Sequence, residues 1–260
     1  AAIVGADAVK NEITAHAVGA LARVPGARTV IEIGGQDSKI IILRDGVVVD
    51  FAMNSVCAAG TGSFLDRQAS RLGVPIEEFG ELALKSNNPT RIAGRCAVFA
   101  ESDMIHKQQV GHPIEDIIWG LCQALVRNYL NNVGKGKDIR PPVVFQGGVA
   151  ANAGMKRAFE EALGMEVIVP AEHKLMGAIG AAILAREARL RPETAFKGFG
   201  VSRLRFTSGS FECTGCSNLC EVSEIRSGDG VVARWGGRCG KWTSARAEGA
   251  IVSLPGAPMV

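Results

Sequence analysis

Apolar and polar positions between residues 29 and 54 form a pattern that predicts three antiparallel strands. Three runs rich in β-branched and aliphatic residues, Thr29 to Ile33, Ser38 to Leu43 and Val47 to Phe51, are separated by short polar breaks. The second break contains Asp45-Gly46, and Asp-Gly supplies the positive φ angles that tight hairpin turns need. We therefore expect a strand, turn, strand, turn, strand unit here.

Helical periodicity dominates the middle of the chain. Apolar residues in 113–132 recur at three- and four-residue spacing, which predicts a helix with one core-facing side. Cys122 lies on that side and is interpreted as a small buried hydrophobe. Strands at 141–146 and 165–169 then alternate with helices at about 152–163 and 174–189. This alternation predicts α/β architecture.

The composition changes after Pro192. Arg, Ser and Gly increase, helical periodicity ends, and four of the seven cysteines lie between Cys213 and Cys239. We expect an α/β domain over residues 1–190 and a small β- and turn-rich cysteine module over residues 191–260. The chain begins with neither Met nor a secretory signal, so we expect it to be an internal piece of a longer protein.

The overall composition excludes several classes of protein. With 260 residues and 47% apolar composition, the chain can bury a sizeable core. The formal charge of +3, without a long basic run, argues against nucleic-acid binding, and no apolar stretch approaches the ~20 residues of a membrane span. An odd number of cysteines without a secretion signal favours thiols or metal ligands in the cytoplasm over disulfides.

Two glycine pairs directly follow predicted strands. Gly34-Gly35 and Gly147-Gly148 could let the backbone approach a phosphate or a nucleotide base without a Cβ clash, although glycine pairs also mark ordinary turns. Asp37 could hold a metal-bound water and Lys39 could meet phosphate charge. Neither loop is a Walker A sequence or a G-x-G-x-x-G fingerprint, which excludes P-loop and Rossmann folds.

Two cysteines of the α/β region precede predicted helices. Cys57 follows the third strand, and Cys96 follows Gly94-Arg95. The positive partial charge of a helix N-terminus favours a thiolate, which is the form that ligates metals. Two unrelated buried cysteines are the alternative. Two ligands cannot complete the four-cysteine shell of a [4Fe–4S] cluster, but a two-fold dimer could.

The cysteine module has the spacing C-x2-C-x3-C-x18-C. Its members are Cys213, Cys216, Cys220 and Cys239. Four cysteines match a tetrahedral zinc site or an iron–sulfur site, and a module with few large apolar groups would gain from a metal staple. Four free thiols are the alternative.

Five segments together resemble the ATPase activators of 2-hydroxyacyl-CoA dehydratases and the related ATPase subunits of benzoyl-CoA reductase. They are 32–39, 57–64, 94–103, 145–154 and 177–182. The resemblance implies an actin-like ATPase fold over about residues 1–190 that binds ATP or ADP with Mg²⁺. It assigns Gln36 and Asp37 to catalysis, Cys57 and Cys96 to a [4Fe–4S] cluster shared by a homodimer, and nucleotide binding to Gly34, Gly35, Lys39, Gly147, Gly148, Asn152 and Gly177.

The implied activity is ATP-driven transfer of a low-potential electron to a dehydratase or a related reductase. The sequence departs from the family at one point, because nothing before Thr29 matches the first phosphate loop. A small-molecule kinase of the same superfamily and a non-catalytic nucleotide- or metal-binding scaffold therefore remain alternatives. The cysteine module resembles the junction of long, multidomain activators, so we expect the protein to continue past Val260.

Overall fold

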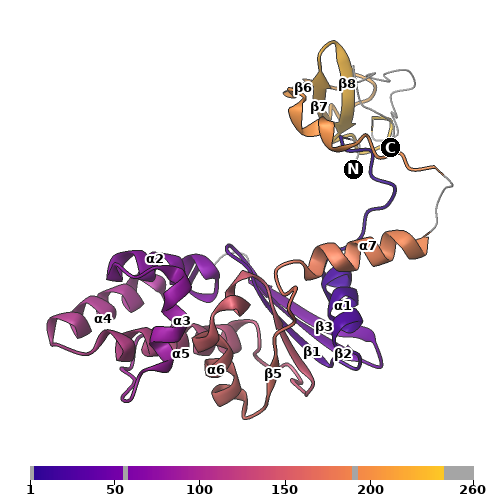
Figure 1. The fold of residues 1–260 in the computed structure, drawn as a ribbon. Coiled ribbons are helices and arrows are strands. Elements are labelled where there is room, and N and C mark those ends of the chain that lie inside the picture. The colour runs from indigo at the N-terminus through magenta and orange to yellow at the C-terminus, as the bar shows by residue number, and fades with distance from the viewer. Residues whose placement is uncertain (1–2, 55–57, 189–192, 243–260) are drawn as a thin grey trace. The chain divides into compact units, whose positions relative to one another are not determined.

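The computed structural model describes residues 3–54, 58–188 and 193–242 (Figure 1). The chain forms two compact units, which we treat separately. One comprises Lys10–Glu187, called here the body, and the other, called the small unit, combines Ala1–Val9 with Ala188–Val260. No helix within the described residues is long and apolar enough to cross a membrane.

The body is built on a mixed sheet of five strands in the order β3-β2-β1-β4-β5. β1 pairs antiparallel with β2, β2 antiparallel with β3, and β1 parallel with β4, which in turn is parallel to β5. The strands are β1 Thr29–Ile33, β2 Ser38–Arg44, β3 Val47–Asn54, β4 Val143–Gln146 and β5 Val167–Ile168. The predicted three-strand unit is confirmed, with Asp45 and Gly46 both at positive φ in the tight turn.

Helices cover both faces of this sheet (Figure 1). The larger core packs helix α5 against one face, and a smaller core packs α1 against the other. The helices are α1 Glu12–Arg23, α2 Gly62–Leu72, α3 Ile76–Leu84, α4 Ala97–Gln109, α5 Ile114–Asn132, α6 Ala153–Leu163 and α7 Met176–Ala188, and two short 3₁₀ turns are η1 Ala58–Gly60 and η2 Gly148–Ala151. The expected α/β class, with a small additional sheet, is confirmed.

The predicted helix over residues 113–132 is α5, and its apolar side forms the centre of the larger core. Tyr129 is fully buried, and its ring meets that of Phe159 edge-on at 5.4 Å. Cys122 is a buried hydrophobe, as expected, and burial raises the pKa of its thiol to about 12. Such a thiol stays protonated at neutral pH.

The small unit contains a three-stranded antiparallel sheet in the order β6-β7-β8. Its elements are η3 Phe199–Arg203, β6 Thr207–Glu212, β7 Glu221–Ser227 and β8 Gly230–Trp235. The first residues of the chain join this unit, which the sequence did not predict. Asp7 accepts hydrogen bonds from Thr194 and from the backbone of Ala195, and the Lys197 amide donates to the Val4 carbonyl at 3.0 Å.

Candidate nucleotide and cysteine sites

Strand pairing brings the two glycine loops to one edge of the sheet. β1 and β4 are parallel neighbours, and Glu32 of β1 is paired with Gln146 of β4. Because the carboxyl ends of parallel strands meet at the same edge, the loops Gly34-Gly35 and Gly147-Gly148 lie side by side. Two segments that are more than a hundred residues apart therefore form one site.

Close backbone packing around these loops requires glycine. Gly147 has a φ of +93°, and an added Cβ would lie 2.3 Å from the Ile33 carbonyl oxygen. The amides of Gly62 and Ser63, at the start of α2, donate to the carbonyls of Gly34 and Gly35 at 2.8 and 2.9 Å. The start of α2 is thereby fixed to the first loop.

Three of the predicted nucleotide-binding residues, Gly35, Gly148 and Asn152, line a cavity of about 310 Å³. An added Cβ at Gly35 or Gly148 would meet no atom within 4 Å, so a side chain at either position would enter open space. The walls also include the apolar side chains of Leu65, Ile76 and Val149. Gly34, Lys39, Gly147 and Gly177 do not line this cavity.

Asn152 lines this cavity and carries an unpaired side-chain donor beside it. Its Oδ1 caps helix α6 by accepting from the Met155 amide at 3.0 Å. Its Nδ2 is buried and has no hydrogen-bond partner among the described residues. An unpaired buried donor costs free energy unless a ligand or water satisfies it. The apolar walls, the open glycines and this donor fit a purine nucleoside.

Lys39 lies among carboxylates, in surroundings that the sequence did not predict. Its side chain is 3% exposed, and its Nζ lies 3.0 Å from Glu32, 2.8 Å from Asp37 and 3.7 Å from Glu12. Burial opposes its charge, but the hydrogen bonds and charges of Asp37 and Glu32 raise its pKa overall. Burial also raises the pKa of Glu32, which the nearby Lys39 partly offsets. Gln36 is exposed at the end of the loop.

His16 is a further member of this cluster that sequence reasoning missed. Its Nδ1 lies 2.7 Å from Gln146 Nε2, and an added Cβ at Gly177 would lie 3.1 Å from its ring. Burial, and then the charge of Lys39, lower its pKa, so the ring is neutral at neutral pH. The sequence offered one signal for the cluster, namely Glu32, a charged residue inside the apolar run of β1.

Cys96 is the N-cap residue of α4, as expected, and its side chain is partly buried. Cys57 lies outside the described residues. The segments beside the two cysteines meet at Asn128 of α5, whose Nδ2 donates to the Gly94 carbonyl at 2.7 Å. An added Cβ at Gly60 of η1 would lie 3.0 Å from the Asn128 Oδ1. One buried amide thus binds the carbonyl two residues before Cys96 and lies close to Gly60, three residues after Cys57.

The cysteines of the small unit occupy the end of its sheet. Cys213 is buried, Cys220 is partly buried, and Cys216 and Cys239 are exposed. The neighbouring Trp242 indole, and then the Gly215 amide, lower the pKa of the Cys213 thiol. Among the residues that the structure describes, no three His, Cys, Asp or Glu side chains are close enough together to hold a metal ion. Metal binding by these four cysteines stays a prediction.

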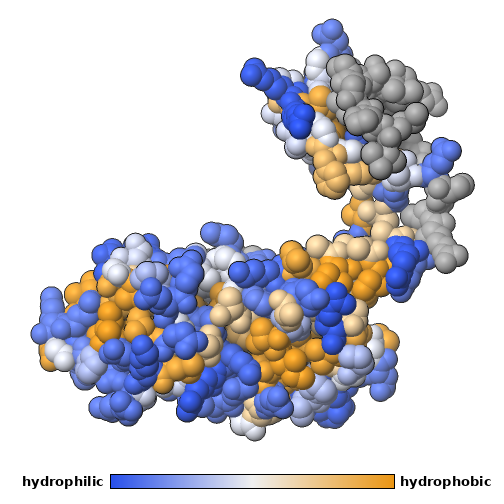
Figure 2. All heavy atoms as spheres, in the orientation of Figure 1, coloured by the Kyte–Doolittle hydropathy of each residue, from blue (hydrophilic) through white to orange (hydrophobic). Residues whose placement is uncertain are grey.

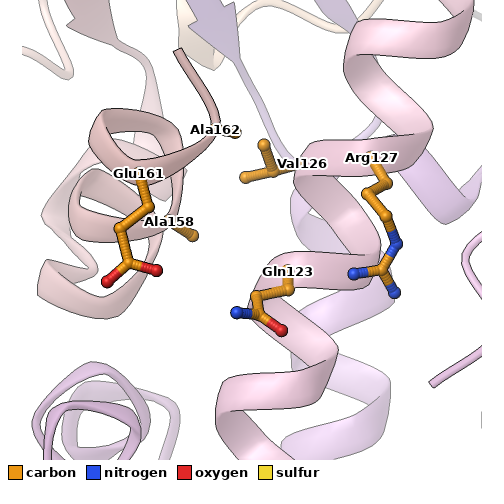
Figure 3. A pocket seen from close by; sticks show the side chains of 6 residues that line it. All are labelled: Gln123, Val126, Arg127, Ala158, Glu161 and Ala162. Atoms are coloured by element: carbon orange, nitrogen blue, oxygen red, sulfur yellow. The ribbon is translucent and has the colours of Figure 1, made fainter. Parts of the chain in front are cut away.

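A second cavity, of about 270 Å³, lies between α5 and α6 (Figure 3). Gln123, Arg127 and Glu161 border it, but the Arg127 guanidinium donates to the Ile92 carbonyl and Glu161 is paired with Arg157. None of the predicted site residues lines this cavity. Its charged groups are already engaged, so we assign it no ligand.

Comparison with known proteins identifies relatives of the body. The chain is 42% identical over 183 residues to the (R)-2-hydroxyglutaryl-CoA dehydratase activating ATPase of Acidaminococcus fermentans, covering 69% of each chain. It is 39% identical over 181 residues to the 2-hydroxyisocaproyl-CoA dehydratase activator of Clostridioides difficile, covering 69% of this chain and 68% of that one. A benzoyl-CoA reductase component of Thauera aromatica is 32% identical over 180 residues, with 66% and 63% covered.

Solved structures give the same result for the fold. Component A of the Acidaminococcus fermentans dehydratase matches with a TM-score of 0.67 at 38% identity, covering 70% of both chains. The Clostridium difficile activator, solved with bound ADPNP, matches with a TM-score of 0.63 at 37% identity and the same coverage. The family model of the BadF/BadG/BcrA/BcrD ATPases matches residues 1–185. The chain therefore belongs to the BadF/BadG/BcrA/BcrD ATPase family.

Proposed function

We propose that this chain is the nucleotide-binding body of an ATP-driven electron donor, which passes a low-potential electron to a 2-hydroxyacyl-CoA dehydratase or a related reductase. The observation that carries the proposal is the cavity at which Gly35, Gly148 and Asn152 meet, in a chain similar to dehydratase activators. The function requires two parts, a nucleotide site and a cluster site.

In the nucleotide site, the adenosine part of ATP or ADP occupies the cavity and the phosphates extend toward Gly34-Gly35. Leu65, Ile76 and Val149 provide apolar contacts for the base, and the free Asn152 Nδ2 donates a hydrogen bond to it. Lys174, exposed at the same cavity, is the cation available to the phosphates. Glycine at positions 35 and 148 leaves the space that the ligand needs.

For hydrolysis, Asp37 would hold a water of the Mg²⁺ that accompanies the nucleotide, and the exposed Gln36 would orient the attacking water. Lys39 acts through Asp37, because its Nζ lies 2.8 Å from the Asp37 carboxylate and is buried away from solvent. Glu32 completes this arrangement by holding Lys39 at 3.0 Å. We thus assign Lys39 to positioning Asp37, in place of the phosphate contact expected from its sequence position.

In the cluster site, Cys57 and Cys96 of two identical chains would hold one [4Fe–4S] cluster, which would supply the electron that is transferred. Cys96 supports the assignment because it is partly buried at the N-terminus of α4, where partial positive charge favours a thiolate. The adjacent Val98 and Phe99 are 67% and 66% exposed and offer an apolar surface to a second copy. Figure 2 shows apolar surface near α2 and α4.

Calorimetry with ADP tests the nucleotide site. Gly148→Val should fold normally, since nothing lies within 4 Å of the added Cβ, but should lower ADP affinity by at least about tenfold, or 1.4 kcal/mol. Gly209→Val is the matched control, because it adds the same side chain at another open glycine, in β6. Equal ADP affinity in the Gly148→Val variant and the control would rule out this cavity.

Iron analysis and visible absorption of the anaerobically reconstituted chain test the cluster site. We expect about one cluster for two chains, lost in Cys57→Ser and in Cys96→Ser. Cys122→Ala is the matched control, because that thiol is buried in the core of the same unit. A colourless chain, or Cys57→Ser and Cys96→Ser variants that keep their iron, would contradict the assignment.

A further inference from the structure

The small unit has almost no apolar core. Within its described residues, the buried apolar side chains are those of Cys213 and Val222, and neither hydrophobic core cluster includes a residue of this unit. A sheet of three strands needs an apolar face or another staple to be stable in water. The apolar burial among the described residues is therefore too small to account for a stable sheet by itself.

Strand register places two cysteines side by side. Glu212, the last residue of β6, is paired with Glu221, the first residue of β7. The next pair outward is Cys213 and Cys220, and the Cys213 amide donates to the Cys220 carbonyl at 2.8 Å. Cys216 lies in the turn that joins them. Three of the four cysteines thus lie at one end of the sheet.

The chain after β8 brings the fourth cysteine to the same end. An added Cβ at Gly236 would lie 2.5 Å from the Glu221 carbonyl oxygen, next to Cys220. The ring centroid of Trp242 is 5.1 Å from that of Phe211, and the Lys241 Nζ lies 3.6 Å from the position of an added Cβ at Gly215. Cys239 lies between these two anchored points.

We propose that Cys213, Cys216, Cys220 and Cys239 bind one zinc ion, which holds the β6–β8 sheet together. Four cysteines that include a C-x2-C pair are the ligands of closed structural zinc sites. In the described conformation no three of these side chains reach one ion, so the exposed Cys216 and Cys239 must turn inward. The four thiols release their protons on binding, and the positive Lys241 at this end offsets the resulting negative charge.

Two properties of the site make the proposal testable by substitution. Cys216 and Cys239 are exposed, so serine at either position removes no buried group. If these residues were free thiols, Cys216→Ser and Cys239→Ser would leave the sheet unchanged. If they are ligands, each variant loses zinc affinity and the sheet loses its staple, because binding energy at such a site is folding energy.

The first experiment is zinc titration of the reduced, metal-free 260-residue chain against a chromophoric chelator. We expect one tightly bound zinc per chain, and at least about a hundredfold weaker binding in Cys216→Ser and in Cys239→Ser. Cys122→Ala and Cys96→Ser are controls that remove a thiol from the body and should keep this zinc. Failure of the chain to bind zinc, or retention of zinc by both small-unit variants, overturns the proposal.

The second experiment follows amide hydrogen exchange of the zinc-loaded chain before and after addition of a chelator. Amides of β6, β7 and β8 should lose protection, and amides of β1 and β2 should keep it. Unchanged protection in the small sheet overturns the structural role of the metal. Iron bound by these four thiols in preference to zinc overturns the choice of metal.

Discussion

The cysteine-bearing parts of the body and of the small unit differ in what surrounds them. In the body, hydrogen bonds from other parts of the protein hold the loop before Cys96. Asn128 binds the Gly94 carbonyl, Asp103 accepts from the Ala93 amide at 2.8 Å, and the Arg127 guanidinium donates to the Ile92 carbonyl at 2.7 Å. In the small unit, Cys213 is itself one of the two buried apolar side chains among the described residues.

The two proposed metal sites would differ accordingly. A cluster on the body could be lost without unfolding, because hydrogen bonds and a packed core already hold the loop before Cys96. Zinc at the end of the small sheet would take the place of a core, so its loss would unfold that sheet. Substitutions in the body measure how much of its stability comes from its own packing, ion pairs and hydrogen bonds.

The largest effect is expected from removing a ring at the centre of the body. Phe159 is fully buried, and its ring meets those of Tyr129 at 5.4 Å and Phe145 at 5.1 Å. Phe159→Ala should lower the free energy of unfolding of the body by about 3–5 kcal/mol. Denaturant unfolding of the body measures this loss, and Phe199→Ala, which truncates an exposed side chain, is the control. A cost below about 1 kcal/mol would show that this core is not what holds the body.

A slightly smaller effect should follow from breaking the buried ion cluster. Lys39→Met leaves the carboxylates of Glu32 and Asp37 without their cation, which should cost about 3 kcal/mol. Adding Glu32→Gln should recover part of that loss, because it removes one uncompensated buried charge. Lys137→Met breaks an exposed pair with Asp50 and should cost less than about 1 kcal/mol. Equal losses of unfolding free energy in Lys39→Met and in Lys137→Met would contradict the argument that a buried ion pair costs more to break than an exposed one.

Removing the amide that binds the loop before Cys96 should cost less stability but should affect bound iron directly. Asn128 is 4% exposed, and Asn128→Ala leaves the Gly94 carbonyl without its partner, at a cost of about 1–3 kcal/mol. Bound iron should then be lost to a chelator faster than from the wild-type chain. Asn132→Ala is the matched control, because it removes the hydrogen bond that the exposed Asn132 donates to the Asn128 Oδ1. Equal rates of iron loss from Asn128→Ala and from the wild-type chain would show that Asn128 does not position the cysteine ligands.

The elements predicted best are those set by local sequence. Strands β1 to β3 follow from runs of β-branched and aliphatic residues and from the Asp45-Gly46 turn. Helix α5 follows from the three- and four-residue spacing of its apolar residues, and each of these signals is readable within one segment. The meeting of the two glycine loops depends on the parallel pairing of β1 with β4, which no local pattern encodes. The sequence predicted this meeting of the loops only through its resemblance to a known family, which assigns both loops to one nucleotide site.

The surroundings of single side chains were the least predictable feature. The sequence indicates that Lys39 could meet phosphate charge, but it gives no sign of the three carboxylates, those of Glu12, Glu32 and Asp37, that surround it. Asn128 carried no signal at all, because an Asn on a long helix is ordinary until the fold shows which carbonyls it reaches. Distant pairings decide these contacts, and a single sequence does not show them.

The smallest effect is expected from the titration of His16. Its pKa is lowered from 6.5 in the folded body by burial and then by Lys39, while Glu12 and Asp37 oppose the shift. A group with a lowered pKa contributes stability above its unfolded pKa and loses it as the pH falls. Protonation also removes the Nδ1 lone pair that faces Gln146 Nε2 at 2.7 Å. The wild-type free energy of unfolding should therefore fall more steeply from about pH 7 to about pH 5 than that of His16→Gln, as measured by denaturant unfolding at each pH. Parallel curves would mean that His16 titrates alike in the folded and unfolded chain.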